Sequence, residues 1–161
     1  MLRMFSRTLT LPTLALLAGT APGLALEAAK SIDVAAPPAK VWATIGDFCG
    51  IGQWHPAIAT CTPSLEGGKP LRTLGLKGGG TLVEAQAARD DKALSYTYAI
   101  VSGPLPVSDY TSTLSVAPKG TGATVSWRGS FKAKGQPDAV AVDAISGIYE
   151  SGLKAIADKA Q

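Results

Sequence analysis

The most restrictive feature of this sequence is an alternation of apolar and polar residues that begins after Cys61 and continues to Lys132. Side chains alternate between two faces along a β-strand, so this two-residue period predicts strands rather than helices. The segments between the alternating runs are rich in glycine, proline and aspartate, which favour tight turns. The pattern therefore predicts an antiparallel meander of six strands, over residues 62–65, 71–76, 81–88, 94–101, 108–117 and 123–132.

Helical patterns and one further strand flank the meander. Residues 30–36 alternate as a strand, and Pro38 suits the first turn of a short helix after it. A second short helix is expected over residues 51–59, with an interruption or kink near Pro56. A single long helix over residues 137–160 closes the chain. Its apolar stripe consists of Ile145, Ile148, Tyr149, Gly152 and Ile156.

These elements predict one α+β domain over residues 26–161. A sheet with one polar face must bury its other face, and only the closing helix is long enough to cover it. We therefore expect a helix-grip arrangement. In it, a curved seven-stranded antiparallel sheet surrounds the long C-terminal helix, and two short helices follow the first strand.

Residues 1–25 have the pattern of a secretory signal peptide. Arg3 and Arg7 provide a basic start, and an apolar run over residues 9–18 follows. Small residues then predict cleavage after Ala25, and the apolar run is short for a membrane span. We therefore expect an exported, periplasmic protein without a membrane anchor after cleavage. Removing two of the 15 basic residues leaves 13 against 12 acidic ones, a net charge of +1 that argues against nucleic-acid binding.

The mature part contains two cysteines, Cys49 and Cys61. An oxidising compartment allows them to form a disulfide, which would contribute about 3 kcal/mol on the chain-entropy model. A redox-active pair is the alternative, but the spacing is far from Cys-x-x-Cys. We therefore favour a structural disulfide.

No metal or cofactor site is predicted. His55 is the only histidine, and no acidic or cysteine cluster with ligand spacing surrounds it. Packing beside Trp54 is its expected role, and an acid or base role at a pocket mouth is the alternative. The glycine run 78–80 lacks the Lys-Ser/Thr ending of a phosphate-binding loop and lies between strands.

The chain also resembles a known superfamily, and the residues that carry the resemblance span most of the mature sequence. They are Asp47-Phe48, Trp54-His55-Pro56, Arg72-Thr73-Leu74, Gly78-Gly79-Gly80, Glu84, Asp90-Asp91, residues 96–100 and 103–106, Tyr110, Trp127 with Phe131, and residues 147–150. This ordered set resembles the polyketide cyclase/dehydrase and START-like superfamily, with its helix-grip or Bet v 1-like fold, which includes the plant abscisic-acid receptors. It looks especially like the small exported bacterial branch, some members of which are labelled methanol-oxidation accessory proteins.

The resemblance implies a ligand cavity between the sheet and the long helix. In the plant receptors one loop gates the cavity, and a second loop latches it. The matching residues here are Gly78, Gly79 and Gly80 in the gate loop and Pro104, Leu105 and Pro106 in the latch loop. Receptor pocket residues match Glu84, Tyr110 and Ser112. The receptor lysine that anchors a ligand carboxylate matches Ala59, so the resemblance does not extend to an acid ligand.

Several candidate ligand-binding residues have a second interpretation. Glu84 either faces the cavity, where burial would raise its pKa, or lies exposed on the convex face. Gly152 either leaves space for a ligand or permits close helix–sheet packing. The other candidates line the cavity or belong to the core; they are Tyr96, Tyr98, Tyr110, Trp127, Phe131 and Tyr149.

The leading interpretation is a protein that binds a mostly apolar small molecule: a lipid, a polyketide-like aromatic or an isoprenoid. An enzyme is the second interpretation. It would be a cyclase or dehydratase in which Glu84, with Tyr110 or His55, moves protons. The third interpretation is an accessory protein that binds an exported dehydrogenase.

Overall fold

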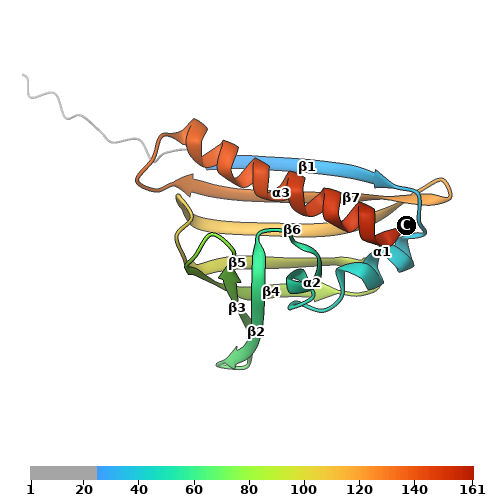
Figure 1. The fold of residues 1–161 in the computed structure, drawn as a ribbon, viewed down its shortest axis with the longest axis horizontal. Helices are drawn as coiled ribbons and strands as arrows, with labels where there is room; N and C mark the ends of the chain where they lie inside the picture. The colour runs from blue at the N-terminus through green and yellow to red at the C-terminus, as the bar shows by residue number, and fades with distance from the viewer. Residues whose placement is uncertain (1–24) are drawn as a thin grey trace, which may run out of the picture.

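The computed structural model describes residues 25–161 (Figure 1). The chain forms β1 (Leu26–Val34), α1 (Pro38–Ile45), α2 (Ile51–Trp54), β2 (Ile58–Glu66), β3 (Lys69–Leu76), β4 (Thr81–Asp90), β5 (Ser95–Ser102), β6 (Val107–Lys119), β7 (Gly122–Ala133) and α3 (Asp138–Ala160). Residues 1–24 of the predicted signal peptide lie outside the described residues.

All neighbouring strands pair antiparallel in one sheet with the order β1-β7-β6-β5-β4-β3-β2. The first strand therefore closes the sheet beside the last one, with Lys30 opposite Trp127. Helix α3 crosses the sheet on one face, and its closest neighbours are β1 and β7 (Figure 1). This architecture confirms the α+β prediction of seven antiparallel strands, two short helices after the first strand and one long C-terminal helix.

The prediction of a second short helix over residues 51–59 is wrong in its extent. Helix α2 ends at Trp54, and His55 already has an extended backbone with φ −75° and ψ 122°. Pro56 disfavours a helical conformation for the residue before it, so it ends the helix rather than kinking it. The chain then enters β2 at Ile58.

Several strand boundaries also differ from the prediction, by up to four residues, and two of these differences have a clear cause. Strand β1 begins at Leu26 rather than residue 30, because β7 continues far enough to pair with it up to Phe131. Strand β5 begins at Ser95 rather than Leu94, because Leu94 has a positive φ of 51° and belongs to the turn after β4.

The disulfide between Cys49 and Cys61 joins the segment between α1 and α2 to strand β2. The two Cα atoms lie 5.7 Å apart, which is within the usual range for a disulfide. The bond therefore ties the loop that carries Phe48 to the edge of the sheet.

Gly152 allows α3 to approach the sheet closely. A Cβ atom at this position would lie 2.7 Å from a ring carbon of Trp127 and 2.8 Å from one of His55. Both rings are buried, so neither can move away freely. Of the two interpretations of Gly152, the structure therefore supports close helix–sheet packing.

We expect Gly152→Ala to lower the free energy of unfolding by up to about 2 kcal/mol. Overpacking costs about 1–3 kcal/mol and outweighs the roughly 1 kcal/mol that alanine gains in a helix. Gly147→Ala is the matched control, because Gly147 lies in the same helix with no atom within 4 Å of its added Cβ. The control should raise the unfolding free energy by about 0.5–1 kcal/mol. Urea unfolding of both variants measures the difference, and stabilisation by both would contradict the packing.

Candidate functional site

A cavity of about 260 Å³ lies beneath α3, and residues of α2, α3 and strands β2 to β7 line it. Apolar side chains form most of its wall, and the polar residues His55, Glu84, Tyr98, Tyr110 and Trp127 interrupt them. The remaining lining residues are Ile51, Ala57, Ile58, Leu74, Leu76, Gly78, Gly79, Leu82, Ile100, Leu105, Ile145 and Ile148.

Glu84 faces this cavity and forms a buried ion pair with Arg72. Only 4% of Glu84 and none of Arg72 is exposed, and Arg72 Nε donates to Glu84 Oε2 at 2.6 Å. The two residues lie directly opposite each other on β4 and β3. Burial raises the pKa of Glu84, and the charge of Arg72 opposes that shift. Burial likewise lowers the pKa of Arg72, but the Glu84 carboxylate outweighs this effect and raises it.

Arg72 was not predicted as a site residue, although it lies two residues before the inward-facing Leu74 and therefore on the same face of β3. Its guanidinium lies 4.0 Å from the ring centre of Phe48 and donates from Nη1 to the Phe48 carbonyl. The ring centre of Tyr98 lies 5.0 Å away on the sheet. An inward-facing arginine opposite an inward-facing glutamate is the signal that would have identified it.

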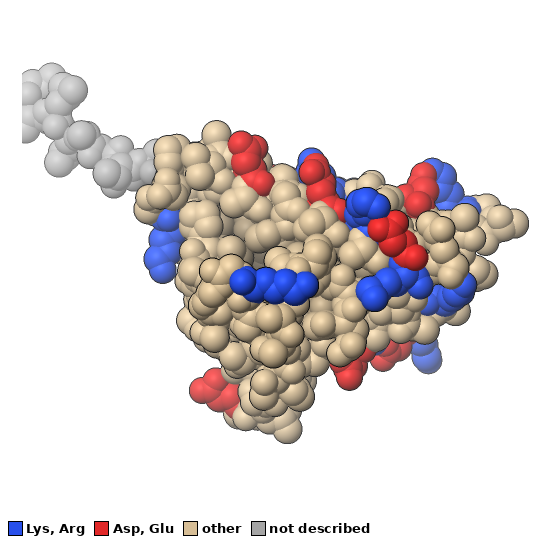
Figure 2. Space-filling view, in the orientation of Figure 1, with Lys and Arg blue, Asp and Glu red and all other residues tan. Residues whose placement is uncertain are grey.

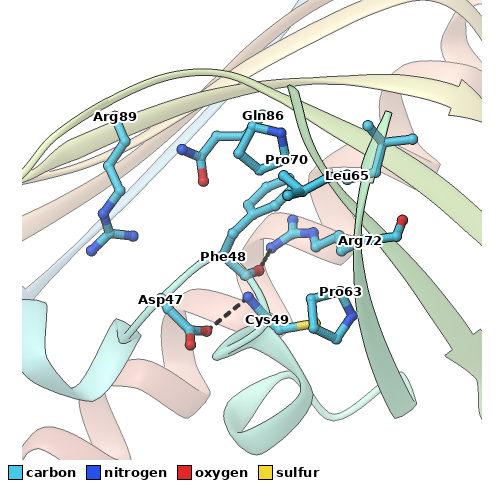
Figure 3. Close-up of a pocket in the computed structure, with 11 residues that line it drawn as sticks. Asp47, Phe48, Cys49, Pro63, Leu65, Pro70, Arg72, Gln86 and Arg89 are labelled. Atoms are coloured by element: carbon cyan, nitrogen blue, oxygen red, sulfur yellow. Dashed lines mark hydrogen bonds between the residues drawn. The ribbon is translucent and has the colours of Figure 1, made fainter. Parts of the chain in front are cut away.

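Arg72 also borders a second, open groove of about 600 Å³ outside the cavity. Figure 3 looks into this groove, where Phe48 stands near the middle with Arg72 on one side and Arg89 on the other. The buried Nη2 of Arg72 has no hydrogen-bond partner among residues 25–161. Arg72 is not part of the cavity wall, but it contacts two wall residues, Glu84 through the ion pair and the ring of Tyr98.

A chain of buried hydroxyl groups crosses the sheet beside the cavity. Trp127 Nε1 lies 3.1 Å from the hydroxyl of Tyr98, which lies 3.3 Å from that of Tyr110. The Tyr110 hydroxyl lies 2.6 Å from that of Tyr149, which lies 2.9 Å from Ser112 Oγ. Burial raises the pKa of Tyr98 and Tyr110 and raises that of Tyr149 to about 12, so all three are protonated at neutral pH.

His55 is buried between Trp54 and Trp127, and both of its ring nitrogens have partners. The backbone N–H of Ala57 lies 3.2 Å from Nδ1, and Nε2 lies 3.1 Å from the carbonyl oxygen of Ile148. Burial lowers the pKa of His55 below its ordinary value of 6.5. The ring is therefore neutral near pH 7, and it connects α2 to α3.

Both loops that were expected to close the cavity border it. Gly78 and Gly79 of the gate loop and Leu105 of the latch loop are lining residues. A Cβ at Gly80 would lie 3.9 Å from Pro104, so the two loops meet. Pro104 and Pro106 do not reach the cavity wall.

Five other predicted residues lie outside the lining. Tyr96 packs against Trp42 and Phe48, and Phe131 stacks on Tyr110. The others are Ser112 and Tyr149, in the hydroxyl chain, and Gly152, under which the helix and sheet meet.

Basic and acidic side chains are interspersed on the face shown in Figure 2. Within residues 25–161 no three His, Cys, Asp or Glu residues lie close enough to hold a metal ion. No helix in the same part of the chain is long and apolar enough to cross a membrane.

We expect Arg72→Met to lower the free energy of unfolding by about 3–5 kcal/mol, because it leaves the Glu84 carboxylate buried without a counterion. Adding Glu84→Met should recover most of that loss. Urea unfolding of the two single variants and the double variant measures the coupling. Lys154→Met, in an exposed pair with Asp158, is the control and should change stability little. A double variant as unstable as the sum of the singles would contradict this account.

Comparison with known proteins identifies a matching protein family and similar solved structures. A sequence model of the family described as polyketide cyclase/dehydrase and lipid transport matches residues 25–161. No curated protein matches the chain. The solved structure of the protein XoxI from Bacillus cereus is 32% identical with a TM-score of 0.78, over 83% of this chain and 94% of that one.

Two more distant structures share the fold alone. The Zhui aromatase/cyclase from Streptomyces sp. R1128 is 16% identical with a TM-score of 0.70, over 85% of this chain and 94% of that one. Ara h 8.0201 is 17% identical with a TM-score of 0.69, over 84% of this chain and 97% of that one. The family match and the likeness to XoxI confirm the superfamily predicted from the sequence. Because the family match covers residues 25–161, the chain belongs to the polyketide cyclase/dehydrase and lipid transport family.

Proposed function

We propose that this protein binds a mostly apolar small molecule in the cavity beneath α3 and is not itself a catalyst. The observation that carries the proposal is an apolar cavity of about 260 Å³ with a few buried polar groups at its wall. Such a lining is typical of small-molecule sites, where apolar surface gives affinity and a few polar groups give orientation.

The volume favours a compact ligand. An apolar cavity of about 150 Å³ holds benzene, so 260 Å³ corresponds to roughly ten non-hydrogen atoms. A polyketide-like ring system of one or two rings fits this size, whereas an extended lipid or a long isoprenoid would require the cavity to open.

The polar groups at the wall suit binding better than proton transfer. A general acid or base must be free to exchange a proton with the ligand. His55 uses both ring nitrogens within the protein, and Arg72 occupies one oxygen of Glu84. These contacts favour ligand binding over a cyclase or dehydratase activity.

Native mass spectrometry of protein purified from an export-competent host tests the binding. We expect a native mass that exceeds the denatured mass by a discrete amount, which identifies a bound molecule. Absence of an excess, even after incubation with an organic extract of the host, would favour the role of an accessory protein for an exported dehydrogenase.

The apolar probe indene and one pair of variants localise the binding site. Ile100 lines the cavity, while the next residue, Val101, points away and is 57% exposed. Ile100→Trp should fill the cavity and weaken indene binding at least tenfold in an NMR titration, whereas Val101→Trp should leave it unchanged. Equal affinity in both variants would place the binding elsewhere.

We further propose that the protein is exported to the periplasm, with cleavage after Ala25 and a disulfide between Cys49 and Cys61. The positions of Cys49 and Cys61 support the disulfide. A disulfide in turn supports export, because disulfides persist in oxidising compartments such as the periplasm. The denatured mass should correspond to residues 26–161 less two hydrogens. A mass that retains the first 25 residues or both thiols would contradict export or the disulfide, respectively.

A further inference from the structure

The hydrogens of the buried hydroxyl chain can be assigned by counting donors. Ser112 Oγ lies 2.8 Å from the carbonyl oxygen of Arg128, which can only accept. The single hydrogen of Ser112 is therefore used there, and Ser112 must accept from Tyr149. Because Tyr149 also has one hydrogen, it must accept from Tyr110.

The same argument extends to the cavity wall. Tyr110 gives its hydrogen to Tyr149, so it accepts from Tyr98. Tyr98 in turn accepts from the indole N–H of Trp127, which is a donor only. The hydrogen bonds thus run in one direction, from Trp127 to the carbonyl of Arg128. Neither tyrosine hydroxyl at the wall has a hydrogen left for a ligand.

His55 also has no free hydrogen. The N–H of Ala57 points at Nδ1, so Nδ1 is the acceptor and the ring hydrogen lies on Nε2. That hydrogen is donated to the carbonyl oxygen of Ile148. Both nitrogens of the ring are therefore occupied.

Glu84 provides an acceptor that the protein leaves free. Arg72 donates to Oε2, and no donor among residues 25–161 reaches Oε1. Tyr98 pairs with Gln86, two residues along β4 from Glu84, and both Glu84 and Tyr98 line the cavity. Glu84 therefore lies at the same polar part of the wall as the tyrosine hydroxyls.

We propose that the cavity selects ligands that donate a hydrogen bond, namely compact apolar phenols, alcohols or N–H compounds, and that Glu84 Oε1 accepts the bond. This inference rests on the proposed binding function and specifies its ligand class. The polar side chains of the wall offer acceptors only, so none of them can pair with the acceptor of a ketone, ether or carboxylate. Arg72 does not relieve this, because it lies outside the wall.

Three probes of equal shape test the selection by NMR titration of the mature protein. Indole carries an N–H donor, benzofuran carries an ether oxygen in its place, and indene carries neither. Hydrogen bonds to a charged group favour indole over benzofuran by about tenfold or more. If hydrophobicity alone decided the affinity, indole would bind most weakly, because it is the most polar of the three probes.

Glu84→Gln tests which residue accepts the bond. The amide is neutral and presents donors as well as an acceptor, so the preference for indole over benzofuran should fall to about threefold or less. Glu66→Gln is the matched control, because Glu66 is exposed at the end of β2. The control should retain the full preference.

Tyr110→Phe tests the hydroxyl chain independently of Glu84. Without an acceptor at residue 110, the hydrogen of Tyr98 becomes free to point into the cavity. Benzofuran affinity should therefore rise at least threefold in this variant.

The outcomes separate the two proposals. Benzofuran binding as tightly as indole to the native protein would overturn the selection for donors while the binding function stands. Binding of none of the three probes would overturn the binding function and this inference together. An unchanged preference in Glu84→Gln would remove Glu84 from the site.

Discussion

The buried ion pair of Arg72 and Glu84 is the interaction on which the polar end of the cavity depends. Two opposed charges with almost no exposure are stable only when their geometry is good and their remaining groups find partners. The sheet provides the first condition, because the two residues are directly opposite on β3 and β4. The loop between α1 and α2 contributes to the second, because the carbonyl and ring of Phe48 both contact the guanidinium. The adjacent disulfide at Cys49 holds that loop against β2.

The packing of α3 explains why the cavity occupies only part of the space beneath the helix. At Gly152 the helix approaches the rings of His55 and Trp127 so closely that a single methyl group would not fit. Ile145 and Ile148, which precede this contact by one to two turns, line the cavity instead. Gly152 thus sets the distance between α3 and the sheet at this point. The residues before it, Ile145 and Ile148, border the cavity that remains between helix and sheet. A well-packed interior resists change at such a contact, so the distance between helix and sheet is set at this point.

The sequence predicted the sheet well because its evidence is local: alternation marks strands, and glycine or aspartate marks turns. The prediction failed where the evidence was ambiguous, as in residues 51–59, where an apolar run with Pro56 was consistent with a kinked helix. The sequence left Glu84 either inward-facing or exposed, and the structure places it inward. Arg72 was missed because its role depends on the register between two strands. The direction of the hydroxyl chain was beyond any sequence argument, since its members come from β5, β6, β7 and α3.

The direction of that chain also bears on catalysis. A proton relay needs a terminal group that can take up and release a proton, as a carboxylate or histidine does. Here the chain ends at the backbone carbonyl of Arg128, which does neither at physiological pH. Protonation of Glu84 would remove the counterion of Arg72 in a buried environment, which costs several kcal/mol. The hydrogen bonds at the cavity wall therefore oppose proton exchange there, which supports the proposed binding function over a catalytic one.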